Sequence, residues 1–77
     1  MQNERIEALK KDYLQGFPAF CGLRADAMSF GEMDASFEIR PEHLQQDGFV
    51  HAGALATLAD HTAGYASFST VADGYRI

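Results

Sequence analysis

The sequence predicts a small α+β domain in which an antiparallel hairpin is combined with two helices. Three observations lead to this class. Apolar residues recur at helical spacing near the N-terminus, alternate along residues 33–40, and occur on nearly every side of residues 52–69. The chain has 77 residues, which is enough for one small domain. We therefore expect residues 1–77 to form a single domain.

The first predicted helix covers residues 2–14, where acidic residues precede basic ones in the order that suits the helix dipole. Its apolar face is formed by Ile6, Leu9, Tyr13 and Leu14. Gly16 and Pro18 are expected to end the helix. Phe17, Phe20 and Leu23 follow in an apolar stretch that we expect to pack under it.

Two strands are predicted over residues 24–30 and 33–40, and together they suggest an antiparallel hairpin. The first strand alternates only weakly. The second alternates clearly, which is typical of a strand with one buried and one wet face. Its apolar face consists of Met33, Ala35, Phe37 and Ile39. Pro41 stops this strand because it has no backbone N–H for the ladder, and residues 41–51 are expected to be a polar loop.

The longest predicted element is an alanine-rich helix over residues 52–69. A helix that is apolar all round is typically buried rather than lying on a surface. Two strands and one further helix are too few to enclose it. We therefore expect either a truncated domain or a fold that partner chains complete, because a chain this small is only marginally stable alone.

Composition excludes several classes of function. The net charge of −5 repels phosphate backbones, so nucleic acid is not an expected partner. The N-terminus lacks the apolar core of a signal peptide, and no apolar run reaches membrane-spanning length. We expect a cytoplasmic protein without a membrane partner.

The cysteine and histidine residues give little sign of chemistry. The single Cys21 excludes an internal disulfide and is expected to be a small buried side chain. His43 lies in the polar loop and is expected to be solvated, whereas His61 is expected to pack or to lie on the helix surface. The spacing of His43, His51 and His61 does not match metal ligation, so we expect no metal site.

Asp60 is the most informative residue because it lies in the middle of the helix that we expect to be buried. Buried carboxylates need a partner and are candidates for function. A less buried helix, with Asp60 facing water, fits the same residues. At about 100° per residue one narrow stripe holds small or polar side chains: Gly53, Thr57, Asp60 and Gly64. Such a stripe suits either a narrow ligand or a closely packed neighbouring helix.

The start of this helix is the second candidate. Backbone N–H groups at a helix N-terminus are unpaired and can bind an anion or a developing oxyanion, although an ordinary helix start has the same pattern. Ala52 and Asp60 are separated by about 12 Å along the axis. A reacting carbonyl must lie about 3 Å from both donor and nucleophile. One helix cannot provide this, so we expect a site at a dimer interface between two antiparallel copies, and not a His51–Asp60 pair within one helix.

The segment Gln45–Asp60, with the sequence QQDGFVHAGALATLAD, resembles the PaaI-like branch of the hotdog-fold acyl-CoA thioesterases, in the 4-hydroxybenzoyl-CoA thioesterase superfamily. That family has an Asn, a Gly, His-Gly-Gly, and then a mostly apolar helix with an acid nine residues after the His. The resemblance is strongest over residues 41–66, and the upstream helix and hairpin agree in order. It implies a hotdog fold, an antiparallel sheet wrapped around the central helix, of which this chain is the N-terminal half.

The resemblance also implies roles for individual residues. Asp60 is the expected nucleophile or general base of a thioesterase, the Ala52 amide polarises the thioester carbonyl, and Gln45 holds the carbonyl or water. The remaining expected substrate-binding residues are Gly48, His51, Gly53 and Thr57, with His51 shaping the loop and Gly53 allowing close approach. Coenzyme A belongs to the substrate, so no cofactor is expected. The expected assembly is a homodimer or a dimer of dimers.

Two substitutions depart from the family pattern. Ala52 replaces the first Gly of the usual pair, and Gln45 replaces Asn. Both affect the expected rate or substrate choice more than the fold. The family's later strands supply much of the coenzyme A and acyl contact, so the alternatives are a non-catalytic acyl-CoA-binding module and an inactive truncated fragment.

Overall fold

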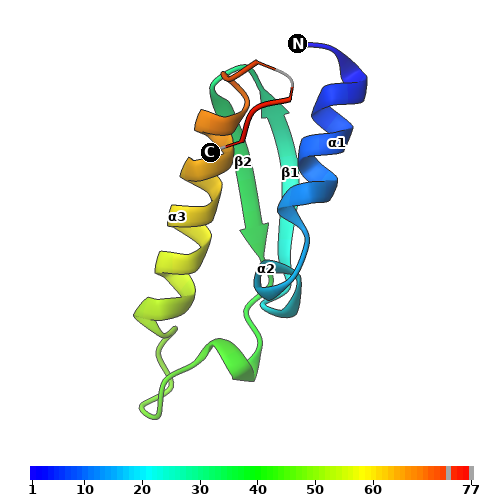
Figure 1. Cartoon of the computed structure of the whole chain (residues 1–77). Coiled ribbons are helices and arrows are strands. Elements are labelled where there is room, and N and C mark those ends of the chain that lie inside the picture. The colour runs from blue at the N-terminus through cyan, green and yellow to red at the C-terminus, as the bar shows by residue number, and fades with distance from the viewer. Residues whose placement is uncertain (73, 77) are drawn as a thin grey trace.

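The computed structural model describes residues 1–72 and 74–76 and has the predicted α+β class (Figure 1). The elements are α1 (Asn3–Tyr13), α2 (Phe17–Phe20), β1 (Leu23–Ser29), β2 (Glu32–Phe37), the 3-10 helix η1 (Pro41–His43) and α3 (Ala52–Phe68). β1 and β2 form a two-stranded antiparallel hairpin, and the long helix α3 packs mainly against β2. The predicted order of helix, hairpin and long helix is confirmed, and the loop at 41–51 contains the short helix η1.

Helix α1 is fixed to the rest of the chain by its apolar face and by several polar contacts, among them those of Tyr13 and Arg5. Leu9 and Tyr13 are buried, and the Tyr13 hydroxyl is hydrogen-bonded to Thr62 Oγ1 in α3 at 2.9 Å. The Arg5 guanidinium donates to the carbonyl oxygens of Phe68 at 3.3 Å and Val71 at 2.8 Å. These carbonyls lie at and just beyond the end of α3, and the Phe68 carbonyl also accepts from the Val71 N–H at 3.2 Å. Arg5 therefore caps α3 from a neighbouring helix.

A bulge in β1 explains why the sequence of this strand alternates only weakly. The register pairs Ala25 with Ala35 and then Ala27 with Asp34, so Asp26 is an extra residue in β1. The insertion places Met28 on the same face as Leu23, and both are buried. A bulge of this kind hides the period of two from a simple count of residues.

The hydrophobic core lies at the end of the molecule where the N-terminus and the hairpin turn meet the end of α3 (Figure 1). Its buried members are Leu9, Met28 and Phe68, with Ile6, Met33, Tyr65 and Val71 packed around them. The buried Ser69 joins the hairpin turn to α3: the Gly31 N–H donates to Ser69 Oγ at 2.7 Å, and that hydroxyl donates to the Ala66 carbonyl at 2.7 Å. This end is closed by both apolar packing and hydrogen bonds.

The expectation that the long helix is buried on all sides is wrong for the single chain. Within α3 only Phe68 is buried, Leu55 is 51% exposed, and Asp60 is exposed. A two-stranded hairpin is too narrow to cover more than one face of a helix. The expected packing of Phe17 and Phe20 under the first helix is also wrong, since they are 62% and 78% exposed.

The molecule is elongated for its size. Its radius of gyration is 13.4 Å, whereas a compact chain of this length has about 11.5 Å. Its accessible surface of 5177 Å² exceeds the roughly 4,650 Å² expected for its mass. Exposed aromatic side chains occur at both ends: Phe17, Phe20 and Phe49 at the end remote from the core, and Phe30 and Tyr75 near the core.

Candidate functional site

The loop before α3 is closed on itself by backbone hydrogen bonds. The His51 N–H donates to the His43 carbonyl at 2.7 Å, and Leu44 and Val50 form an antiparallel bridge. Inside this bridge the Gln45 side-chain oxygen accepts a hydrogen bond from the Asp47 N–H. Gln45 thus contributes to the shape of the loop, and its predicted contact with substrate stays a prediction.

His43 is buried, which corrects the expectation of a solvated side chain. It is 4% exposed, and its ring lies 4.2 Å from the Phe37 ring between centroids. Nδ1 accepts from the Arg40 N–H at 2.9 Å, and Nε2 donates to the Cys21 carbonyl at 2.7 Å. The polar loop folds back over the end of β2, and the imidazole is accommodated there because both ring nitrogens find partners.

The start of α3 leaves one backbone donor unpaired. His51 is the N-cap, with φ −63° and ψ 134°, and its Nδ1 accepts from the Gly53 N–H at 2.7 Å. The Ala54 N–H donates to the His51 carbonyl at 3.0 Å. Among the residues that the structure describes, the exposed Ala52 N–H has no hydrogen-bond partner. The amide predicted to polarise a carbonyl is therefore the one left available.

Gly53 has a local structural reason to be glycine. A Cβ at this position would lie 2.9 Å from Nδ1 of the capping His51 ring, closer than van der Waals contact allows. Gly48 has φ +88°, a conformation that residues with a side chain rarely adopt. Both glycines thus serve the geometry of the helix start, whatever further contact they make with a ligand.

Asp60 lies on an open depression of about 630 Å³ between α2 and α3. The lining residues are Phe17, Pro18, Ala56, Thr57, Asp60 and His61. The Thr57 hydroxyl donates to the Gly53 carbonyl at 2.8 Å, so it stabilises the first turns of α3. Sequence reasoning missed the α2 wall, although the adjacent Phe17 and Pro18 after a glycine are a signal for a short helix start that exposes an aromatic ring.

The structure brings only part of the predicted site together within one chain. Asp60 and Thr57 share the depression, whereas Ala52, Gly53, Gly48 and Gln45 do not line it. The Ala52 amide and the Asp60 carboxylate stand about 12 Å apart along one helix axis. A single copy therefore presents an oxyanion donor and a carboxylate at separate places.

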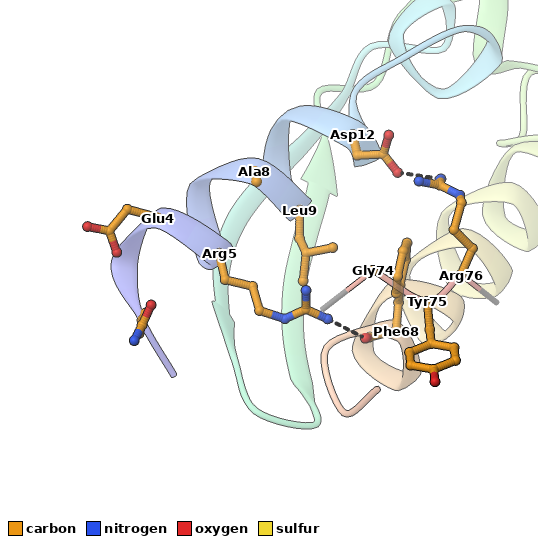
Figure 2. A pocket seen from close by; sticks show the side chains of 10 residues that line it. Glu4, Arg5, Ala8, Leu9, Asp12, Phe68, Gly74, Tyr75 and Arg76 are labelled. Atoms are coloured by element: carbon orange, nitrogen blue, oxygen red, sulfur yellow. Dashed lines mark hydrogen bonds and ion pairs between the residues drawn. The ribbon is translucent and has the colours of Figure 1, made fainter. Parts of the chain in front are cut away.

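A second pocket, of about 510 Å³, lies at the core end between α1 and the chain after α3 (Figure 2). Three of its charged side chains are engaged: Arg5 caps α3, and Arg76 pairs with Asp12 at 2.9 Å. Arg76 also lies over the Phe68 ring, 5.2 Å from its centroid. None of the predicted site residues lines this pocket, so we interpret it as part of the packing between the chain ends.

Asp12 and Tyr65 perturb one another beside this pocket. The Tyr65 hydroxyl donates to Asp12 Oδ2 at 2.6 Å, and this hydrogen bond, followed by that of Arg76, lowers the pKa of the Asp12 carboxyl. Burial, together with the Asp12 carboxylate, raises the pKa of Tyr65 to about 12. Both shifts favour the pair as it stands, with a charged Asp12 and a neutral Tyr65.

Residues 1–72 and 74–76 contain no group of three or more His, Cys, Asp or Glu side chains that could hold a metal ion. No helix in this part of the chain is long and apolar enough to span a membrane.

Comparison of the chain with models of known protein families, with curated proteins and with solved structures gave no match. The resemblance of residues 45–60 to the thioesterases therefore depends on that motif alone, and the function drawn from it is a proposal.

Proposed function

We propose that this chain hydrolyses an acyl-CoA thioester at a site shared by two copies. The observation that carries the proposal is the unpaired, exposed Ala52 N–H at the start of α3. The neighbouring Gly53 and Ala54 amides are occupied, by the His51 ring and the His51 carbonyl. The free donor coincides with the position at which the thioesterase motif calls for one.

The Ala52 amide suits a developing negative charge. During attack on a thioester the carbonyl oxygen gains charge, and an oriented backbone donor stabilises it more strongly in the transition state than in the ground state. The positive end of the helix dipole lies at the same point and adds to this stabilisation. Asp60 supplies the other half of the reaction, either by attacking the carbonyl carbon or by removing a proton from water. If Asp60 attacks, the C–S bond breaks to give an acyl-Asp60 anhydride that water then hydrolyses; if Asp60 deprotonates water, the hydroxide adds to the carbonyl carbon and the C–S bond breaks. In both routes coenzyme A leaves as a thiolate that takes up a proton lost by water.

A second copy is needed because the two groups are too far apart in one chain. Two α3 helices that lie antiparallel would bring the Ala52 amide of one chain to Asp60 of the other. The exposed positions Ala56, Ala59 and Ala63 of α3 carry only methyl groups and permit close approach of such a partner. The elongated shape and the excess accessible surface support self-association as a homodimer or a dimer of dimers.

The carboxylate is tested by measuring hydrolysis of a series of acyl-CoA thioesters with Asp60→Asn. We expect kcat to fall by about 10²–10⁴-fold. Asp34→Asn is the matched control, because Asp34 is an exposed acid in β2 outside the depression. Equal rates for the wild type and Asp60→Asn would remove Asp60 from the mechanism.

The amide is tested by Ala52→Pro, which deletes the N–H without an unfavourable backbone. Proline is tolerated at the first position of a helix, and His51 already has the extended conformation that proline requires of the preceding residue. We expect kcat to fall by about 10²–10³-fold while the circular dichroism spectrum is retained. Ala52→Gly keeps the donor and should keep most of the rate. Loss of activity with both variants would point to side-chain packing instead.

Sharing of the site is tested by mixing the two inactive chains. A heterodimer of Asp60→Asn and Ala52→Pro chains contains one site with both native groups and one site with neither. With random exchange, about a quarter of the wild-type activity should return. Absence of any recovery after verified exchange of subunits would contradict a shared site.

A non-catalytic acyl-CoA-binding module is the second candidate. It is favoured by the surroundings of Asp60, which is exposed and has no hydrogen-bond partner among the residues that the structure describes. Ligand binding measured by calorimetry, without release of free thiol, would select this alternative.

A further inference from the structure

The three histidines of the chain differ in what their ring nitrogens do. In His43 and in His51, Nδ1 accepts a hydrogen bond from a backbone N–H, of Arg40 and of Gly53 respectively. In His61, Nε2 is bonded to the Tyr13 carbonyl oxygen at 2.9 Å and therefore acts as a donor. Protonation has opposite consequences for an accepting nitrogen and a donating nitrogen.

The partners of His43 fix its protonation state. A backbone N–H can only donate, so Nδ1 must carry a lone pair, and a carbonyl can only accept, so Nε2 must carry hydrogen. Only the neutral ring with hydrogen on Nε2 satisfies both. A second proton on Nδ1 would point at the Arg40 N–H, in a place where the ring is 4% exposed and water cannot substitute.

His51 is in the same situation at the start of α3. Its Nδ1 is the side-chain cap of the helix, and a proton there removes the acceptor for the Gly53 N–H. The charged ring would also face the positive end of the helix dipole. The two rings act on one segment, because the His51 N–H is itself held by the His43 carbonyl at 2.7 Å.

We propose that His43 and His51 are positioning residues that together hold residues 40–53, and that they do so only while both imidazoles are neutral. Acidification releases the segment and with it the start of α3. The restraint of residues 40–53 by the two imidazoles follows from their hydrogen bonds alone. Its effect on catalysis, through the position of the Ala52 amide, rests on the proposed function.

The charged and titratable groups around the two rings do not compensate for the lost hydrogen bonds. They are Cys21 and Arg40 in the segments against the His43 ring, Glu42 beside it in η1, and Asp47 in the loop. The Arg40 guanidinium donates to the Phe20 carbonyl at 2.9 Å. Glu42 and Asp47 are exposed, and neither forms an ion pair with an imidazole within the described part of the chain.

The experiment is a nuclear magnetic resonance titration of the 77-residue chain from about pH 8 to about pH 5. The ring proton signals report when each imidazole becomes charged, and amide protection factors report the hydrogen bonds. We expect protection of the Arg40 amide to fall about tenfold as His43 is charged, and the Gly53 amide signal to shift as His51 is charged. Unchanged Arg40 and Gly53 amides beside fully charged rings would overturn the proposal.

Three variants separate the contributions. His43→Asn keeps an acceptor three bonds from Cα and should abolish the pH-dependent loss of Arg40 amide protection, which we call the pH step at Arg40. His51→Asn should likewise abolish the pH-dependent shift of the Gly53 amide signal, the pH step at Gly53, since asparagine is a good N-cap. His61→Gln is the control and should leave both steps in place. If either asparagine variant retains its pH step, the assignment to that imidazole is wrong.

Acyl-CoA hydrolysis measured over the same pH range separates this inference from the proposed function. A loss of kcat that follows the Gly53 amide in the wild type and disappears in His51→Asn supports both. Amide steps without any thioester cleavage support the positioning role and contradict the thioesterase. Cleavage whose pH profile is unaffected by both asparagine variants contradicts the link between the two.

Discussion

The two ends of this molecule are built differently. At the core end, the side chains of Leu9, Met28 and Phe68 are buried together, and the hairpin turn is hydrogen-bonded to Ser69. At the open end, where α2, the loop before α3 and the first turns of α3 meet, the aromatic rings of Phe20 and Phe49 are 78% and 71% exposed (Figure 1). Every residue of the candidate site lies toward the open end.

The two ends differ in how much of their apolar surface the chain itself covers. At the core end an apolar cluster is buried and the end of α3 is capped by Arg5, although Phe30 and Tyr75 remain 65% and 70% exposed there. The open end is held by hydrogen bonds of a loop and little apolar contact, as is common for binding regions of low local stability. Large exposed apolar patches are typical of interaction sites, so the proposed second copy is expected to dock at this end. Stability and function are thus expected to respond to substitutions at opposite ends.

The difference in packing between the two ends is tested most directly by deleting one large aromatic ring at each end. Phe68→Ala removes a ring that is 3% exposed and should lower the free energy of unfolding by about 3–5 kcal/mol. Phe20→Ala removes a ring that is 78% exposed and should change it by less than about 0.5 kcal/mol. Urea denaturation measures both. Similar losses would mean that the open end is packed in solution.

A smaller effect is expected from the hydrogen bond between Tyr65 and Asp12 at the core end. Tyr65→Phe removes a donor to a carboxylate and should lower the free energy of unfolding by about 1.5–3 kcal/mol at neutral pH. The matched control is Tyr75→Phe, at an exposed position whose hydroxyl makes no hydrogen bond within the described part of the chain.

The hydrogen bond between Tyr65 and Asp12 should make the stability of the fold depend on pH at both the acid and the alkaline end. The pKa of Asp12 is lower in the folded chain than in the unfolded one, so its contribution is present above the unfolded value near 4 and is lost as pH falls through the folded value. The pKa of Tyr65 is raised to about 12, so its contribution is present below about 10 and is lost as pH rises toward 12. Tyr65→Phe should flatten both limbs of the stability curve. A curve that keeps its acid limb in this variant would assign it to other carboxylates.

The smallest of these effects is expected at Gly48 in the open end. Its φ of +88° makes any side chain unfavourable, and a Cβ at this position would meet no heavy atom within 4 Å. Gly48→Ala should therefore cost about 1–2 kcal/mol from the backbone alone. Gln46→Ala, in the same loop, is the control. If the loop adjusts freely, Gly48→Ala will leave the unfolding midpoint unchanged and the loop will prove softer than its hydrogen bonds indicate.

Local pattern was sufficient for much of the fold. The helical spacing of Leu9 and Tyr13 correctly predicted a first helix with these residues inward, and the alternation of residues 33–37 correctly predicted a strand with one wet face. The predicted extension of this strand to residue 40 is wrong, because β2 ends at Phe37 and Ile39 is 61% exposed. The bulge at Asp26 could not be predicted, because an inserted residue is visible only when the partner strand is known.

The failures share a cause, which is that composition reports what a side chain prefers and not what covers it. Leu55 and its neighbours make α3 apolar, yet the chain supplies cover for one face only. The expectation for His43 fails in the opposite direction, since its polar loop folds back and pairs both ring nitrogens. The Ala52 amide was already a candidate donor from the sequence, and the structure adds that the neighbouring Gly53 and Ala54 amides are paired. The α2 wall of the depression became visible only in three dimensions.

The bond between Gly31 and Ser69 has a mechanical consequence. It pins the last turn of α3 to the hairpin, while the first turns have no comparable attachment to the sheet. His61 and Thr62 are hydrogen-bonded to Tyr13 of α1, so the helix is also restrained in its middle, and the segment from Ala52 to Asp60 extends beyond these attachments by about 12 Å. A tilt of about 5° in this segment alone would carry the Ala52 amide through about 1 Å and leave the core in place.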